Sequence, residues 1–204
     1  MSSILPIVGV LLAGGSGGLH ELEDKPLRML AERTLLDHTL NIAKPQVRDI
    51  VLNISTSTTT YQKFGLPIVV DSIDGYTGPL SGVLAAMEWA KKYQSEIEWV
   101  VSFTTDTPFL PKDMVHNLVK SIIEAQADIA CCRSDENVHG ACSLWPVRLM
   151  DDLKKDLAAG LRNLNEWVSK YDVAYADFEV EPMDPFFKIN NDEDLEVAET
   201  LFKT

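Results

Sequence analysis

A glycine-rich segment, a lysine and two aspartates are the groups in this sequence best suited to chemistry on a phosphate. Gly14-Gly15 close an apolar run, and Lys25 lies ten residues further along the chain. The backbone N–H groups of such a segment can bind an anion, and the lysine can add a point charge. The spacing matches neither G-x-G-x-x-G nor G-x-x-x-x-G-K-[ST], so it indicates neither a dinucleotide-binding motif nor a P-loop. A plain glycine turn between a strand and a helix remains the alternative.

The two aspartates stand at the ends of short apolar runs. Asp106 lies in the segment VSFTTDTPFLP, and Asp71 closes the run IVVD. Mg²⁺ prefers one or two carboxylates together with phosphate oxygens of a substrate, so Asp106 is a candidate magnesium ligand. The alternative is an aspartate that only caps a turn. Because ligands of open α/β sheets bind at the carboxyl ends of the strands, we expect Gly14-Gly15, Asp71 and Asp106 to converge.

Other residue types add little chemistry. Gly75, Gly78 and Gly82 could allow close approach of a ligand to the backbone, or could serve loop flexibility and helix packing. The histidines show no spacing typical of catalysis or metal binding; they are His20, His38, His116 and His139. Cys131, Cys132 and Cys142 suggest neither a disulfide framework nor a zinc site, and a cytoplasmic location fits them.

Composition excludes several classes of function. The chain has 204 residues, enough for a full core, and we expect a single domain over residues 1–204. The formal net charge of −13 argues against nucleic acid as a partner, since binding a phosphate backbone needs a basic surface. No run of apolar residues is long enough for a membrane span, so we expect no membrane partner.

Short apolar runs alternate with amphipathic stretches, and these elements must position the groups above. We predict strands over residues 7–13, 49–54, 68–71, 100–104, 127–132 and 141–145. We predict helices after Gly78-Pro79 and over residues 111–127, 161–171 and 191–202. Continuous rather than alternating apolarity is typical of strands buried on both faces. The sequence therefore predicts an α/β fold with three layers, a mostly parallel sheet with helices on both faces.

The order of motifs resembles that of the molybdenum cofactor guanylyltransferase family. LAGG is followed by ten residues that end in DK, then by a strand with Asn53, by VVD and by GPLxG. TDTPFLP, GLRxLxxW and DPFFxIN complete the set, with DL after the last motif. The similarity runs from Leu12 to Leu195, and the ordered set is more specific than any single motif.

The resemblance implies a Rossmann-like nucleotidyltransferase fold and a reaction. The family transfers GMP from GTP to the phosphate of molybdopterin and releases pyrophosphate, so the implied partners are GTP and molybdopterin. Whether proteins that handle the molybdenum cofactor are also partners stays open. The attacking group would be a phosphate that is already ionised at pH 7, so no general base is needed and the isolated histidines are consistent with this chemistry.

The resemblance also implies roles for individual residues. The guanine and ribose contacts fall on Leu12, Ala13, Gly14, Asn53 and Asp71, with Gly15 in the same nucleotide-binding segment. The phosphate-contacting lysine falls on Lys25, and the Mg²⁺ ligand falls on Asp106. The acceptor side falls on Gly78, Gly82, Arg162 and Asn190.

The chain departs from the family pattern in two places. An arginine and two glycines of the family loop are replaced by Leu19, Glu21 and Leu22, and Lys188 replaces the first of two asparagines in the last motif. A phosphate-binding cation is therefore missing, and we expect Arg28 or His20 to be the candidates to replace it. Two interpretations stay open: an active transferase, for GTP or for CTP or another acceptor, and a non-catalytic protein that binds nucleotide or cofactor.

Overall fold

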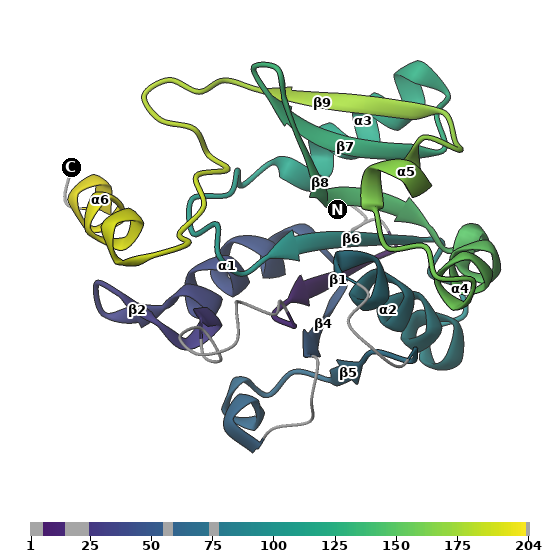
Figure 1. Ribbon diagram of the computed structural model, residues 1–204, viewed down its shortest axis with the longest axis horizontal. Helices are drawn as coiled ribbons and strands as arrows, with labels where there is room; N and C mark the ends of the chain where they lie inside the picture. The colour runs from purple at the N-terminus through teal and green to yellow at the C-terminus, as the bar shows by residue number, and fades with distance from the viewer. Residues whose placement is uncertain (1–5, 15–24, 55–58, 74–77, 203–204) are drawn as a thin grey trace, which may run out of the picture.

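A computed structural model describes residues 6–14, 25–54, 59–73 and 78–202 (Figure 1). Within these ranges seven strands form one sheet in the order β5-β4-β1-β6-β8-β7-β9, and β2 pairs with β3 in a separate hairpin. The strands are β1 (Ile7–Leu12), β2 (Met29–Leu30), β3 (Arg33–Thr34), β4 (Asp49–Ile54), β5 (Ile68–Val70), β6 (Trp99–Thr104), β7 (Ile129–Ser134), β8 (Asn137–Pro146) and β9 (Val173–Phe178). The α-helices are α1 (Leu35–Ala43), α2 (Pro79–Tyr93), α3 (Met114–Ala125), α4 (Met150–Ala158), α5 (Leu164–Val168) and α6 (Asp192–Phe202).

The register of the parallel strands brings three strand ends level with one another. Leu12, the last residue of β1, pairs with Asn53 on β4 and with Thr104 on β6. β5 continues this parallel part of the sheet beside β4. On the other side β8 runs antiparallel to both β6 and β7, and β9 runs parallel to β7. The carboxyl ends of β4, β1 and β6 therefore form one continuous edge on which a ligand can lie.

Helices cover both faces of the sheet (Figure 1). Leu36 of α1 and Leu118 of α3 pack against the sheet on one face, and Leu84 of α2, Leu153 of α4 and Trp167 of α5 belong to the core on the other face. The residues predicted to form one side of α2 are all fully buried: Leu80, Val83, Leu84 and Met87. Burial of each such side chain stabilises the fold by about 1.5–3 kcal/mol. The predicted three-layer α/β fold is confirmed.

Two helices are shorter than the sequence pattern predicted. α3 begins at Met114 rather than at Pro111, because Asp113 has φ −115° and ψ 15°, which is not helical. The carbonyl of Pro111 instead accepts a hydrogen bond from Gln46 Nε2 at 3.1 Å. α5 begins only after Asn163, whose side chain caps it by accepting from the N–H of Glu166 at 3.1 Å.

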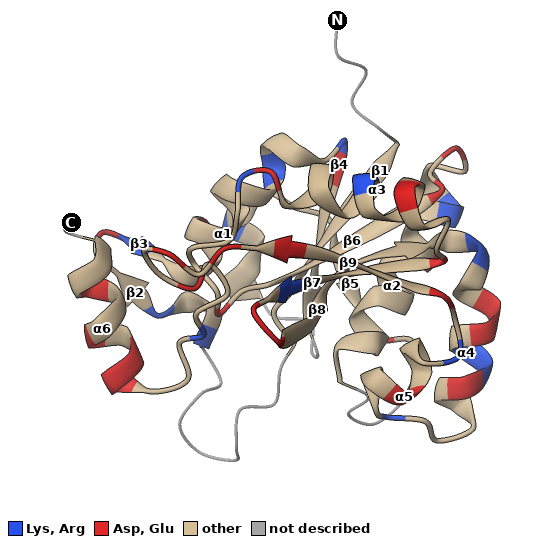
Figure 2. Cartoon of the chain, turned by 90° about the horizontal axis from the view of Figure 1, so that it is seen from above, with Lys and Arg blue, Asp and Glu red and all other residues tan. Residues whose placement is uncertain are grey.

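The C-terminal segment crosses back to the end of β6 and then forms α6 beside the β2–β3 hairpin. A small separate core joins these parts, and Leu30, Leu35, Ile189 and Ala198 are all buried in it. α6 matches its predicted range closely, and Figure 2 shows acidic residues on this helix. None of the helices in the described ranges is long and apolar enough to cross a membrane.

Candidate nucleotide-binding site

A pocket of about 370 Å³ lies along the carboxyl ends of the parallel strands. Many of its lining residues were predicted: Leu12, Ala13, Gly14, Lys25, Asn53, Asp71, Gly78, Asp106 and Asn190. The others are Pro26, Pro79, Ser81, Thr104, Thr105, Ala141 and Lys188. Gly82 and Arg162 do not line it, and Gly15, Leu19, His20, Glu21, Leu22 and Gly75 lie outside the described residues. The pocket extends from the end of β5 to β8, a span suited to an elongated ligand.

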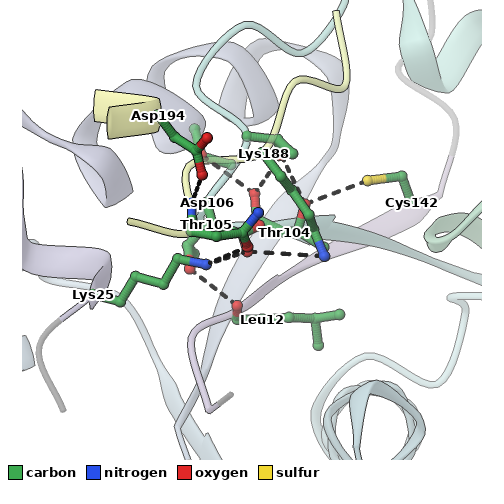
Figure 3. Close-up of polar contacts among 11 residues, drawn as sticks. Leu12, Lys25, Thr104, Thr105, Asp106, Cys142, Lys188 and Asp194 are labelled. Atoms are coloured by element: carbon green, nitrogen blue, oxygen red, sulfur yellow. Dashed lines mark hydrogen bonds and ion pairs between the residues drawn. The ribbon is translucent and has the colours of Figure 1, made fainter. Parts of the chain in front are cut away.

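Lys25 and Asp106 meet in the middle of this pocket. Lys25 Nζ lies 2.8 Å from Asp106 Oδ2, and the two side chains are 19% and 17% exposed (Figure 3). Lys25 Nζ also donates to Asn190 Oδ1 at 3.3 Å, although these residues are far apart in sequence. The ammonium and the carboxylate therefore share one site, and a bound phosphate can meet both of them.

The turn after β6 holds Asp106 in place. The hydroxyl of Thr107 donates to the carbonyl of Thr104 at 2.9 Å, and the hydroxyl of Thr105 donates to the carbonyl of Leu12 at 3.1 Å. The carbonyl of Asp106 accepts from the N–H of Ile189 at 2.9 Å. These bonds hold the turn against β1 and the C-terminal segment, so the backbone position of Asp106 is fixed.

One oxygen of Asp106 is available to a cation. Oδ1 is buried and has no hydrogen-bond partner among the described residues. An unpaired buried carboxylate oxygen is costly, and a metal ion offers it a partner. No group of three or more His, Cys, Asp or Glu side chains in the described ranges could hold a metal by itself. This single carboxylate suits Mg²⁺, which takes its remaining ligands from substrate phosphates and water.

The other end of the pocket contains a hydrogen-bonded set of side chains. Asp71 accepts from Asn53 Nδ2 at 2.9 Å through one oxygen and from the Ser81 hydroxyl at 2.8 Å through the other. Asn53 is 4% exposed, and Ser81 also donates to the carbonyl of Gly78 at 2.8 Å. Each carboxylate oxygen keeps a further lone pair, so this end can still accept from the N–H groups of a nucleobase or from ribose hydroxyls.

Gly78 and Gly82 have different structural reasons to be glycine. Gly78 precedes α2 with φ +70°, a conformation that disfavours L side chains. At Gly82, within α2, a Cβ atom would lie 2.4 Å from Asn53 Oδ1 and 2.5 Å from Leu12 Cδ2. Gly82 thus packs behind Asn53 and Leu12 and does not line the pocket, whereas the resemblance implied a place for it on the acceptor side.

Two predicted basic residues point elsewhere. Arg162 donates to the carbonyls of Leu157 and Leu161 at 2.8 and 2.7 Å and so satisfies the end of α4. Arg28 forms an ion pair with Asp192 on α6 and does not line the pocket. Arg28 is therefore close to Lys25 in sequence without sharing its place in the pocket.

Residues that the sequence argument passed over also line the pocket. Thr104 and Thr105 precede Asp106 directly, so their place at the strand end could have been inferred from the same motif. Lys188 Nζ lies 3.9 Å from Asp106 Oδ2. In the sequence, Lys188 was notable only because it replaces an asparagine of the family motif. The position of Lys188 in the fold depends on packing between segments that are distant in sequence, and no local sequence pattern indicates such packing.

Comparison with known proteins identifies the family. Residues 9–174 match the MobA-like NTP transferase domain. A molybdenum cofactor guanylyltransferase of Rhodopseudomonas palustris (strain BisB5) is 38% identical over 193 residues, which cover 94% of this chain and 92% of the relative. The chain belongs to the MobA-like NTP transferase family.

Solved structures share the fold of this MobA-like NTP transferase. The molybdopterin-guanine dinucleotide biosynthesis protein A of Archaeoglobus fulgidus has a TM-score of 0.75 and 20% identity, with 96% of this chain and 98% of that chain covered. A protein of Mycobacterium tuberculosis H37Rv, solved in complex with manganese, has a TM-score of 0.68 and 16% identity, with 97% and 100% covered. The resemblance inferred from the motif order is confirmed, and this MobA-like protein is a nucleotidyltransferase.

Proposed function

We propose that this protein transfers GMP from GTP to the phosphate of molybdopterin, with Mg²⁺ bound at Asp106, and releases pyrophosphate. The observation that carries the proposal is the 2.8 Å contact between Lys25 and Asp106 inside one strand-end pocket. A cation and a metal-binding carboxylate at one point are what a triphosphate needs in a protein whose net charge is −13. The names of the curated relatives supply the expected nucleotide and acceptor.

The nucleoside would bind at the end of β4 and β5. Asp71 offers carboxylate acceptors there for the N–H donors on the edge of guanine. Both hydrogens of Asn53 Nδ2 are engaged, by Asp71 at 2.9 Å and by the carbonyl of Val69 at 3.4 Å, so Asn53 orients this carboxylate. Leu12, Ala13 and Gly14, together with Gly15, would lie under the ribose and the first phosphate. The N–H of Ala13 is already bonded to the carbonyl of Asn53 at 2.9 Å, so it fixes this segment to β4.

The triphosphate would then extend from β1 to β6. Lys25 would release part of its contact with Asp106 and neutralise the β- and γ-phosphates. Mg²⁺, when bound to Asp106, would supply charge stabilisation of the phosphate oxygens. Asn190, which accepts from Lys25 at 3.3 Å, would keep the lysine directed into the pocket.

The reaction itself needs no proton transfer by the protein. An oxygen of the acceptor phosphate forms a bond to the α-phosphorus, and the bond from that phosphorus to the α–β bridging oxygen breaks. The bridging oxygen leaves with the electron pair as part of pyrophosphate. Because the attacking phosphate monoester is ionised near neutral pH, the protein contributes position and charge.

The acceptor would approach from the side of β8, past Asn190, because Gly78 lies with Ser81 at the Asp71 end of the pocket. The buried, unpaired thiols of Cys131, Cys132 and Cys142 fit a reducing cytoplasm as the place of action. In that compartment the product would be released where proteins that handle the molybdenum cofactor could bind it directly.

Purified protein with GTP, Mg²⁺ and molybdopterin provides the test. We expect stoichiometric pyrophosphate and a guanine dinucleotide of the pterin, and we expect GTP to raise the Tm more than CTP, ATP or UTP does. GTP binding without product would contradict the proposal and favour a non-catalytic binding protein. A larger Tm shift and turnover with CTP would instead identify a cytidylyltransferase.

A further inference from the structure

A second lysine reaches the carboxylate of Asp106 from the side opposite Lys25. Lys188 Nζ lies 3.9 Å from the same oxygen, Oδ2, that Lys25 contacts at 2.8 Å (Figure 3). The Lys188 side chain is 52% exposed and lines the pocket, whereas that of Lys25 is 19% exposed. At 3.9 Å Lys188 Nζ is too far from Asp106 for a hydrogen bond, so its ammonium keeps its donors for a ligand.

The backbone around Lys188 is held from both sides. Ile189 is fully buried, and its N–H donates to the carbonyl of Asp106 at 2.9 Å. The N–H of Asn190 donates to Asp194 Oδ2 at 2.7 Å, and Phe186 stacks on His139 with ring centroids 4.3 Å apart. The packing therefore fixes where the Lys188 side chain leaves the backbone, and the fold does not require a lysine there for its own contacts.

The charge count near Asp106 leaves one cation in excess. Among the described lining residues, the charged groups are Lys25, Lys188, Asp71 and Asp106. Asp71 is engaged with Asn53 and Ser81 at the nucleoside end, so two ammonium groups face one carboxylate at the phosphate end. The four charges of the pocket balance as a whole, but the two ammonium groups make its Asp106 end locally positive, and this local charge attracts an anion to that point.

The position of Lys188 relative to the strands of the sheet indicates which anion it binds. Figure 3 shows the Lys188 ammonium on the side of Asp106 away from Lys25 and toward Cys142 of β8, and Ala141 of the same strand lines the pocket. The nucleoside end lies on the opposite side of β1, at β4 and β5, and Lys25 already serves the triphosphate from that direction. What remains for Lys188 is the anion that enters from β8.

We propose that Lys188 is a substrate-contacting cation that binds the phosphate monoester of the acceptor, on the side of Asp106 opposite Lys25. This inference rests on the proposed function, because it assigns the acceptor end of the same pocket. Two anions must approach each other in this transfer, and Lys188 offsets their repulsion while it directs the attacking phosphate toward the α-phosphorus.

The test compares Lys188→Gln with Lys188→Arg and with Lys155→Gln, an exposed lysine of α4 that lies outside the pocket. We expect Lys188→Gln to lower kcat/KM for molybdopterin about 10- to 100-fold through its KM, with the KM for GTP changed less than about twofold. Lys188→Arg should recover most of the loss, and Lys155→Gln should behave like the wild type. An unchanged KM for molybdopterin in Lys188→Gln, or an equal rise in both KM values, would overturn the assignment.

Equilibrium binding separates this inference from the proposed function. Calorimetric titration of molybdopterin alone into the wild type and Lys188→Gln requires no turnover. Binding about tenfold weaker in the variant, with a shallower dependence on salt, supports the role of Lys188 even if no GMP is transferred. Equal binding by both proteins, or no binding by the wild type, overturns it. A matched Tm for the two proteins shows that the variant is folded.

Discussion

The backbone of Gly82 lies directly against the side chain of Asn53, at 2.4 Å from Asn53 Oδ1 to the position that a Cβ atom would take. This contact explains how α2 and β4 together shape the end of the pocket that contains Asp71. The Asn53 side chain lies between Gly82 and Asp71. Its amide can donate to Asp71 at 2.9 Å only while no side chain at position 82 occupies the space beside it. The glycine therefore acts on the site from behind.

Gly82→Ala should weaken both the fold and nucleotide binding. Helix propensity alone would make alanine more favourable by about 1 kcal/mol. The clash with Asn53 and Leu12 reverses that sign, and we expect a net loss of about 1–3 kcal/mol in the free energy of unfolding, with weaker GTP binding. Denaturant unfolding and calorimetric titration measure the two effects. An increase in stability with unchanged GTP affinity would contradict the described packing.

Asp71→Asn should reduce the affinity for the nucleotide. Asp71 accepts from two donors, Asn53 and Ser81, and an asparagine would have to present its own NH₂ group to one of them. We expect the Kd for GTP to rise about tenfold, which corresponds to the loss of one charged hydrogen bond. Asp49→Asn, at the other end of β4, is the control because Asp49 contacts Gln94 outside the pocket. Equal Kd values for the two variants would exclude a nucleoside role for Asp71.

The cysteines should not react while the protein is folded. Burial raises the pKa of Cys131 and of Cys142, and burial together with the neighbouring Cys142 raises that of Cys132 well above its ordinary value. Thiolate is the reactive form, so Ellman's reagent at pH 8 should label none of the three thiols before guanidinium is added and all three afterwards. Rapid labelling of the native protein would show that β7 or β8 opens.

His139 should make stability depend on pH in a defined direction. Burial lowers the pKa of His139, Asp184 opposes the change, and Lys188 lowers the pKa further. The unfolded chain then binds the proton first, so the free energy of unfolding should fall as the pH drops through about 6.5 and should stop falling below the pKa of the folded protein. His139→Gln should lose this component of the slope. Parallel stability curves for the wild type and the variant between pH 5 and 7.5 would contradict the shift.

The sequence predicts the parts of the site that depend on local pattern. β1, β4 and β6 contain runs of consecutive buried apolar residues because helices cover both faces of the sheet. Residues just after parallel strands, such as Asp71 after β5 and Asp106 after β6, are expected at the ligand-binding edge. α2 is equally clear, since its buried side follows the helical period. Lys25 could be joined to Asp106 only through the family resemblance.

Long-range packing decides what the sequence pattern could not predict. Arg28 lies three residues from Lys25, yet its partner is Asp192 on α6. Gly82 was expected at the acceptor side and instead packs behind Asn53. Lys188 was noted as a departure from the family motif, and only the folded chain brings it to Asp106. Each of these outcomes depends on contacts between segments that are far apart in sequence.

The proposal that Asp106 binds the Mg²⁺ used in the transfer can be tested by the rate of pyrophosphate release. The variant Asp106→Asn is assayed with GTP, Mg²⁺ and molybdopterin. We expect a loss of about 100-fold or more relative to the wild type, because under the proposed function the carboxylate would hold the cation that stabilises the transferred phosphate. Asp151→Asn, an exposed aspartate of α4 outside the pocket, should retain the full rate. An Asp106→Asn variant that releases pyrophosphate at the wild-type rate would contradict the account.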